Sequence, residues 1–163
     1  LRIGVSFAKG LCYGIRKPLI AVGSLDALAE VAREDYEAGI VDVDDWESAR
    51  LCPMVDARRM EVYARVFDTT GAPLSEVKAE VIGGVSFAAW RDGKHPFVIF
   101  GNGARKCREA LPDARFIEVA PSARGLARRA QEAFDAGRFE DLAYFEPFYL
   151  KDFVVTASKK RLL

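Results

Sequence analysis

The chain has 163 residues, of which 50% are hydrophobic, and its 24 basic side chains balance its 24 acidic ones. This balance does not favour a protein that binds nucleic acid through a strongly basic surface of its own. The three cysteines are an odd number at wide spacing, which excludes a disulfide framework and matches no zinc motif. No apolar run approaches the ~18 residues of a membrane span. We therefore expect a cytoplasmic globular protein of one domain or two small ones, with no membrane partner.

Residues 1–16 predict a helix that is apolar around most of its circumference. One stripe, at four-residue spacing, consists of Ile3, Phe7 and Leu11, and an adjoining small and apolar stripe consists of Gly4, Val5, Ala8 and Cys12. A helix of this kind packs against more than one neighbour. Because the apolar pattern starts at once, with no initiator methionine and no capping residue, we expect the chain to be part of a longer protein.

The next elements follow a proline. A strand is predicted over residues 19–22, and Ser24 is a candidate N-cap for a helix over residues 25–33. Acidic residues then dominate residues 35–50. This composition predicts a loop between two halves of the chain, with a short helix around Trp46.

The second half opens with three strands of alternating polarity. They are predicted over residues 51–56, 59–68 and 77–81, with a Gly- and Pro-containing turn before the third. In the second and third strands, apolar residues occupy one face and charged residues the other. This alternation is typical of an antiparallel sheet with one face in water.

The remaining segments alternate between helices and strands. Ser86 is a candidate N-cap for a short helix that ends at Trp90. Further strands are predicted at 96–100 and 116–119, and further helices at 104–111 and, capped by Ser122, up to residue 136. The last helix would turn Leu126, Ala130, Ala133 and Phe134 inward and end at Gly137. Such alternation implies parallel strands with helices against the sheet.

This order of elements predicts an α/β fold. Three antiparallel strands followed by alternating helices and parallel strands form one ribonuclease-H-like, actin-like lobe, which residues 51–163 would supply. Residues 1–50 would form the C-terminal part of a first, similar lobe, with the order helix-strand-helix, together with a hinge.

The most specific local sequence is Asp56-Ala-Arg-Arg-Met-Glu-Val-Tyr63, at the turn between the first two strands of the second half. It lacks the Gly-, Ser- and Thr-rich backbone that cradles phosphate, and its two arginines favour ion pairs that fix the turn. We favour a structural role over contact with a ligand, and both readings stay open. Gly101-Asn-Gly103 only weakly indicates a phosphate loop and is more simply a tight turn. The lone histidine, His95, cannot form a His-pair metal site, and we expect it in a surface loop.

A second motif is Glu146-Pro-Phe-Tyr-Leu150. With the opening helix and the Asp56–Tyr63 turn, it resembles the TsaB family of bacterial tRNA threonylcarbamoyladenosine biosynthesis proteins. This glycoprotease-like family is related to the actin-like, Hsp70-like ATPases. Its motifs are Asp-Ala-Arg-x-x-Glu-Val-Tyr and Glu-Pro-x-Tyr-Leu. The resemblance lacks the family's N-terminal segment, which ends in a Gly-Pro-Gly-Ser loop. It implies a structural role for the motif residues Asp56, Arg58, Glu61, Tyr63, Glu146, Pro147 and Tyr149.

The resemblance implies a function exerted through partners. The chain would be a non-catalytic subunit that dimerises with a TsaD-like transferase, joined by a TsaE-like ATPase. The complex attaches a threonylcarbamoyl group to the adenosine beside the anticodon, so tRNA would be a partner only through the complex. Family members also form homodimers through the same surface. The implied interface consists of Arg2, Ile3, Ser6, Phe7, Gly10 and Leu11. The alternative is that both stripes of the first helix pack within the lobe.

The resemblance implies no catalytic residue, cofactor or metal site. In the transferase a His-x-x-x-His pair binds a metal, and the corresponding positions here are about Ser24 and Leu28, neither of which is a useful ligand. Two alternatives stay open. One is an actin-like nucleotide-binding hydrolase or a glycoprotease-type peptidase, and the other is a structural or regulatory dimer unrelated to tRNA.

Overall fold

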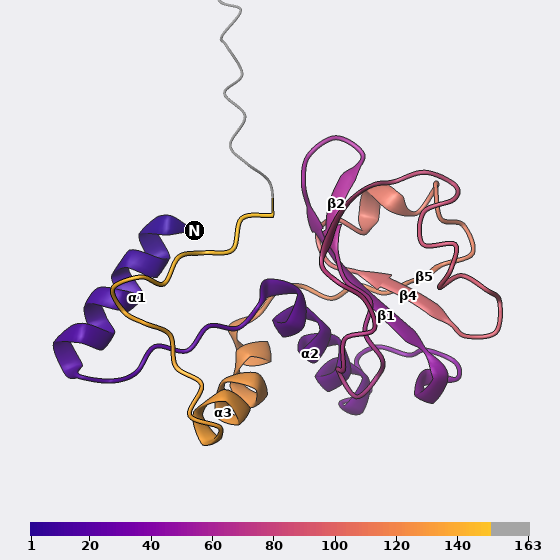
Figure 1. Ribbon diagram of the computed structural model, residues 1–163. Coiled ribbons are helices and arrows are strands. Elements are labelled where there is room, and N and C mark those ends of the chain that lie inside the picture. The colour runs from indigo at the N-terminus through magenta and orange to yellow at the C-terminus, as the bar shows by residue number, and fades with distance from the viewer. Residues whose placement is uncertain (151–163) are drawn as a thin grey trace, which may run out of the picture.

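The computed structural model describes residues 1–150, so residues 151–163 of the predicted second lobe lie outside the described part. The elements in chain order are α1 (Arg2–Ile15), α2 (Ser24–Glu37), the 3-10 helix η1 (Trp46–Ser48), β1 (Arg50–Asp56), β2 (Glu61–Ala64), β3 (Lys78–Val81), β4 (Phe97–Phe100), η2 (Arg105–Cys107), β5 (Arg115–Phe116), η3 (Ala123–Leu126) and α3 (Ala127–Asp135). Figure 1 shows the strands and α2 together in one body, with α1 at the other end of the molecule beyond α3. Among the described residues, no helix is long and apolar enough to cross a membrane.

A five-stranded mixed sheet forms the centre of the larger body, in the order β3-β2-β1-β4-β5. β1 pairs antiparallel with β2 and β2 with β3, whereas β1 pairs parallel with β4 and β4 with β5. The two-residue period is visible in β2, where Val62 and Ala64 are buried and Glu61 and Tyr63 are half-buried. β4 is buried at every position, as expected of a central parallel strand. The predicted ribonuclease-H-like α/β fold is therefore confirmed.

Each face of the sheet has its own apolar core. The core on one face combines Leu51, Val98 and Phe100 of the strands with Leu28, Val31 and Ala32 of α2. Neighbouring strand residues point to the opposite face, where Cys52 and Ile99 meet Ile82, Cys107 and Leu111. One helix therefore covers one face, and the segments around residues 82–90 and 104–111 cover the other.

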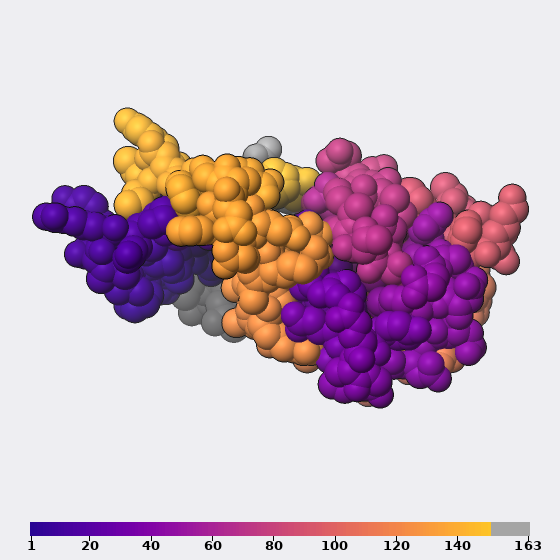
Figure 2. Space-filling model, turned by 90° about the horizontal axis from the view of Figure 1, so that it is seen from below, coloured from indigo at the N-terminus to yellow at the C-terminus, as the bar shows by residue number. Residues whose placement is uncertain are grey.

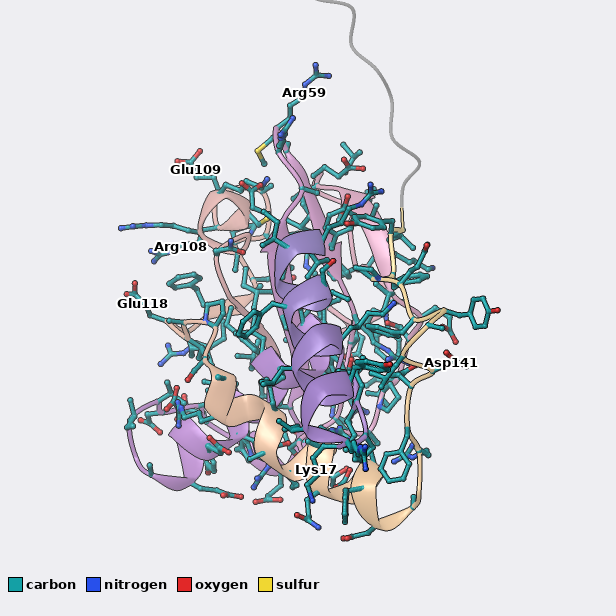
Figure 3. The ribbon with its side chains drawn as sticks, turned by 90° about the vertical axis from the view of Figure 1, so that its left-hand side faces the viewer. Lys17, Arg59, Arg108, Glu109, Glu118 and Asp141 are labelled. Carbon is teal, nitrogen blue, oxygen red and sulfur yellow. The ribbon has the colours of Figure 1, made fainter. Side chains whose placement is uncertain are left out.

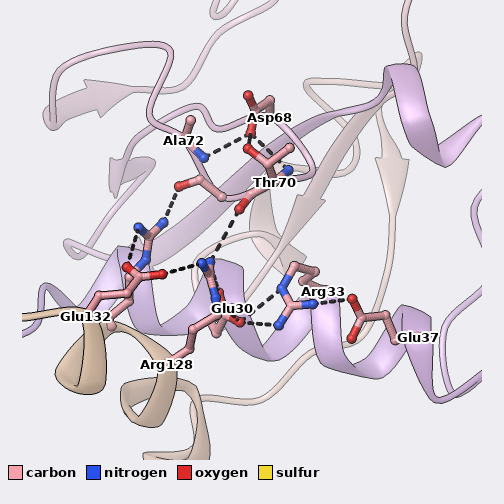
Figure 4. A network of polar contacts seen from close by, with 10 residues as sticks. Glu30, Arg33, Glu37, Asp68, Thr70, Ala72, Arg128 and Glu132 are labelled. Atoms are coloured by element: carbon pink, nitrogen blue, oxygen red, sulfur yellow. Dashed lines mark hydrogen bonds and ion pairs between the residues drawn. The ribbon is translucent and has the colours of Figure 1, made fainter. Parts of the chain in front are cut away.

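The junction of α2 and α3 is built on a buried carboxylate (Figure 4). The side chain of Glu30 is 1% exposed. Its Oε1 accepts hydrogen bonds from Nε of Arg33 at 2.9 Å and from Nε of Arg128 at 2.8 Å. Arg128 and the following Arg129 also donate to carbonyl oxygens of the turn between β2 and β3. One buried side chain thus ties α2 to α3 and, through the arginines, to the sheet.

Two predictions near the start of the chain are wrong in detail. Residues 19–22 form no strand, because within the described residues their one ladder contact is a bridge between Leu19 and Glu140. Ser24 is the first residue of α2, and its N-cap is Gly23 with no side-chain hydrogen bond. The helix also continues to Glu37, into the predicted acidic loop. Its buried face continues as far as Asp35, whose carboxylate pairs with Arg124 of η3, so tertiary contacts outweigh the local acidic composition.

The predicted helices after β3 are shorter than expected. The 86–90 segment is a series of turns, because Ser86 Oγ accepts from the N–H of Gly83 and donates to the carbonyl of Val81 instead of capping a helix. The 104–111 segment holds only the 3-10 helix η2 among turns. Ser122 does cap a helix, but that helix starts as η3 and continues as α3. Of the four residues expected to face inward there, only Ala133 is buried.

Candidate partner interface

The first helix, α1, contains no buried residue. Its apolar side chains are unusually open to solvent: Ile3 is 88% exposed, Phe7 72% and Leu11 51%. Figure 2 shows the indigo α1 at one end of the molecule, separated by the orange α3 segment from the purple and pink body that holds α2 and the strands. An apolar helix with this much exposed surface marks a candidate site of contact with another protein.

One side of α1 rests on the segment that follows α3. Lys9 Nζ donates to the carbonyl oxygens of Ala143 at 3.2 Å and Phe145 at 3.0 Å. The guanidinium of Arg2 lies over the ring of Tyr149, 5.4 Å from its centroid. The half-buried residues of the helix recur at spacings of three and four, and they are Val5, Ala8, Lys9 and Cys12. These contacts define the covered side of α1.

The opposite side of α1 is an open apolar stripe. At 100° per residue, Ile3, Phe7 and Leu11 lie on average about half a turn away from the covered side, with Gly10 among them. A Cβ atom at Gly10 would meet nothing within 4 Å. Nothing in the described chain therefore requires a glycine there, although glycine in a helix interior costs about 1 kcal/mol relative to alanine. Close approach of a partner backbone would explain it.

The six residues predicted for the interface do not all lie on one side. The open stripe holds Ile3, Phe7, Gly10 and Leu11. Ser6 is exposed between the two sides, and Arg2 lies toward Tyr149. The structure thus groups four of the six.

The Asp56 turn joins β1 to β2 and is held by groups from a distant segment. Lys106 Nζ donates to the Asp56 carboxylate and to the carbonyl oxygens of Arg59 at 2.6 Å and Glu61 at 2.7 Å. The hydrogen bond from Lys106, with a further one from the N–H of Arg58, lowers the pKa of Asp56. Figure 3 shows Arg59 at the outer tip of this hairpin, pointing away from the sheet.

Backbone N–H groups of this turn bond within the protein. The N–H of Asp56 donates to Oδ1 of Asn102 at 3.1 Å, and that of Arg58 donates to Oδ1 of Asp56 at 3.0 Å. The N–H of Ala57 donates to the carbonyl of Glu61. Donors used in this way do not form a concave cradle for phosphate. We interpret the turn as a structural joint.

The Gly101–Gly103 loop packs against the same joint. Gly101 has a φ of 95°, which favours glycine. A Cβ atom at Gly103 would lie 2.9 Å from the carbonyl carbon of Val55, so the loop approaches the β1 backbone closely. Asn102 supplies the acceptor described above. The three residues therefore serve a close contact between β1 and the loop after β4.

The Glu146-Pro147-Phe148-Tyr149 segment lies along α1. Tyr149 contacts Arg2, as described above, whereas Phe148 is exposed and packs on nothing that would bury it. Phe148 therefore contributes no packing between this segment and the rest of the described chain.

The positions that correspond to the metal-binding His-x-x-x-His pair of the transferase, about Ser24 and Leu28, hold no side chains that could bind a metal. Leu28, on the buried face of α2, lies in the core between this helix and the sheet, and Ser24 is exposed at the start of the same helix. Within residues 1–150 no cluster of His, Cys, Asp and Glu side chains could hold a metal ion. Burial raises the pKa of the Cys52 and Cys107 thiols, which keeps both protonated and poorly nucleophilic at neutral pH.

Sequence reasoning missed the residues that hold the sites together. Lys106 and Asn102 act on a turn about fifty residues away, and Lys9 anchors α1 to a segment more than a hundred residues away. No local pattern distinguishes these side chains from other surface polar residues.

Three comparisons bear on the origin of this chain. Residues 1–144 match the family model of TsaD, tRNA N6-adenosine threonylcarbamoyltransferase. Two solved structures from Pseudomonas aeruginosa are similar, one described as an uncharacterized protein with similarity to peptidase YEAZ and the other as YeaZ. Both are 22% identical to the chain, with TM-scores of 0.68 and 0.69. The alignments cover 92% and 91% of this chain and 67% of each of those chains, and they show the fold alone. No curated protein matches significantly.

Proposed function

Because the chain belongs to the TsaD family of tRNA N6-adenosine threonylcarbamoyltransferases, we propose that it acts in the threonylcarbamoyladenosine modification of tRNA. We infer a TsaB-type role, in which the chain is a non-catalytic subunit in the cytoplasm. Its partner would be a TsaD-like transferase, a TsaE-like ATPase would join them, and tRNA would be met only through the complex.

The open stripe of α1 carries this proposal. Four of the six residues expected at the interface lie together on it, and its apolar side chains are exposed in the isolated chain. Burying such a stripe against another helix would remove about 25 cal/mol per Å² of apolar surface from water. The same surface would support a homodimer when the transferase is absent.

A docking role also agrees with the residues at the positions of the transferase metal ligands. Ser24 offers one hydroxyl at the helix start, and the buried Leu28 offers an alkyl group. The residues present do not fit a divalent metal of that kind. The alternatives of an actin-like hydrolase or a glycoprotease-type peptidase need a phosphate cradle or an activated nucleophile, and no contact in the described residues favours either.

We further propose that the chain combines parts of two actin-like lobes. Residues 1–50 would be the end of the first lobe and a hinge, and residues 51–163 the second. The motif residues, including Asp56 and Tyr149, would have structural roles at the hairpin and on α1.

Substitutions in the open stripe test the proposal. Phe7→Glu or Gly10→Arg should abolish co-purification with the TsaD-like transferase of the same organism, because each places charge or bulk in an apolar contact. Val85→Glu is a control for Phe7→Glu, because Val85 is also largely exposed, at 85% against 72% for Phe7, but lies on the sheet lobe. Circular dichroism should show that all three variants fold. Undiminished binding by Phe7→Glu and Gly10→Arg would refute the interface.

A genetic experiment tests the pathway itself. Deleting the gene should lower threonylcarbamoyladenosine in bulk tRNA, and the unaltered chain should restore it, whereas Phe7→Glu should not. Unchanged levels after deletion would favour a structural or regulatory dimer unrelated to tRNA.

A further inference from the structure

A pocket of about 500 Å³ opens at the edge of the sheet where β4 and β5 begin. It lies between the loop before η1, the loop before β4 and the start of β5, and it is lined by residues 43–45, 91, 93–97, 113 and 115. β1 starts near this edge and ends at the opposite one with Asp56. The pocket is therefore separate from the Asp56 turn, and α1 contributes no residue to it.

Arg91 fixes one wall of the pocket. Its Nε donates to both carboxylate oxygens of Asp113 at 3.0 Å, and its Nη1 donates to the carbonyl oxygens of Gly84 at 3.0 Å and Ser86 at 2.9 Å. The hydrogen bond from Arg91 lowers the pKa of Asp113. This pair holds the loop before β4 against the start of β5. The charges of Arg91 and Asp113 neutralise each other, so this pair shapes the wall of the pocket and is not available to bind a ligand.

Other charged groups of the pocket are not matched in this way. Within residues 1–150, the exposed side chains of Arg115 and Asp44 take part in no hydrogen bond or ion pair, whereas Lys94 interacts electrostatically with the neighbouring Asp92. Nδ1 of His95 is buried and also has no partner there. Buried polar atoms are usually hydrogen-bonded, so the unpaired Nδ1 of His95, in a pocket lined by charges of both signs, points to a ligand.

The mixture of signs selects the class of ligand. A polyanion would meet the carboxylates of Asp44 and Asp45, and a simple cation would meet Lys94 and Arg115. A small molecule that carries one charge of each sign avoids both conflicts. We propose that this pocket binds a free α-amino acid, with its carboxylate at Arg115 and Lys94 and its ammonium group at Asp44 and Asp45.

The chemistry of each group suits this assignment. The planar guanidinium of Arg115 can pair with a carboxylate through two hydrogen bonds, and His95 can add a third from Nδ1. Asp45 is positioned by Ser48, whose hydroxyl donates to its carboxylate. Val43 and Phe97 supply apolar wall for the amino-acid side chain. The volume is within the range of small-molecule sites, roughly 300–1,000 Å³. The inference does not depend on the proposed function.

Calorimetric titration of the full chain tests the pocket, with glycine, L-leucine and L-glutamate as probes. N-acetyl-L-leucine lacks the ammonium charge, and L-leucinamide lacks the carboxylate. We expect saturable binding of at least one amino acid. We also expect much weaker binding of both leucine derivatives than of leucine, because each leaves one set of charges unpaired.

Two variants locate the binding. Arg115→Ala and Asp44→Asn should each weaken binding roughly tenfold or more, the loss expected for one charge-assisted contact. Arg105→Ala and Asp42→Asn are controls, because they change exposed residues of the same types outside the pocket. The proposal is overturned if no probe binds saturably, if either derivative binds as tightly as leucine, or if the controls weaken binding as much as the pocket variants.

Discussion

Replacing Glu30 by Gln should destabilise the protein at neutral pH far more than its small change in shape suggests. The carboxylate is 1% exposed, and its partners Arg33 and Arg128 are 21% and 35% exposed. A Gln amide keeps one acceptor oxygen but directs its NH₂ group at a guanidinium, so one charge-assisted hydrogen bond is lost. Such a bond contributes roughly 1.5–3 kcal/mol, and we expect a loss of about 2 kcal/mol, since water partly compensates the arginines.

Glu37→Gln provides the matched control. Glu37 pairs with the same Arg33 but is 59% exposed, so its removal should cost only about 0.3–0.5 kcal/mol. Urea unfolding followed by tryptophan fluorescence measures both effects. Trp46 is a suitable probe because it is buried and stacks on Tyr36 of α2, with ring centroids 4.1 Å apart.

The pH dependence gives a second reading of the same contact. Burial acts to raise the pKa of Glu30, but the hydrogen bonds from Arg128 and Arg33 outweigh it, so the pKa lies below its ordinary value of 4.5. The stabilisation is therefore fully present above pH 4.5 and is lost as the pH falls through the lower, folded-state pKa. The stability gap between wild type and Glu30→Gln should shrink over that acid range. Equal losses for Glu30→Gln and Glu37→Gln, or a gap that does not change with acid, would refute this account.

Two further substitutions test the packing and the hairpin. Gly125→Ala would place a Cβ 2.1 Å from the carbonyl oxygen of Ala27 in α2, so urea unfolding should show that the free energy of unfolding falls by about 2 kcal/mol or more. Gly84→Ala is the control, because a Cβ there would meet nothing within 4 Å and stability should change little. Similar losses of stability for both variants would contradict the close approach of Gly125 to α2. Lys106→Met removes the main cause of the lowered pKa of Asp56, which is the hydrogen bond from Lys106. NMR titration should therefore find the pKa of Asp56 raised toward its ordinary value. An unchanged pKa would show that Lys106 does not hold the turn.

The sequence predicted elements well where one local pattern decides them. The all-apolar segment at 97–100 and the alternation at 61–64 each follow from which side chains face a core, so both strands were found. The helix over 25–33 was found but ended too early, because its last turns are held by distant segments: Arg124 of η3 pairs with Glu34 and Asp35, and Tyr36 stacks on Trp46 of η1. The prediction that Ser86 caps a helix is wrong, because its hydroxyl donates to the carbonyl oxygen of Val81 at the end of β3. Local chemistry alone does not choose between such partners.

The candidate sites depended even more on distant contacts. The motif at Asp56 was visible in the sequence, but the lysine that satisfies it lies fifty residues away. The pocket at the start of β4 and β5 unites Asp44, Lys94 and Arg115 only because parallel pairing brings these segments to one edge. Each residue looks like a solvated surface charge in the sequence. Their position around one pocket, beside the unpaired buried Nδ1 of His95, makes them a candidate site, and only the structure shows it.

The apolar pattern of the first helix, α1, predicted the helix but not what packs against it. The periodicity of its apolar residues predicted both the helix and its two stripes. An apolar stripe indicates that it packs against another surface, but it does not say whether that surface belongs to the same chain or to a partner. The structure covers one side with the segment around Phe145 and leaves Ile3, Phe7 and Leu11 in water. Glycine at position 10 weakens the helix without relieving any contact in the described chain. A sequence that keeps both an exposed apolar stripe and a costly small residue beside it makes most sense when another backbone packs there, and the Gly10→Arg variant tests that inference directly.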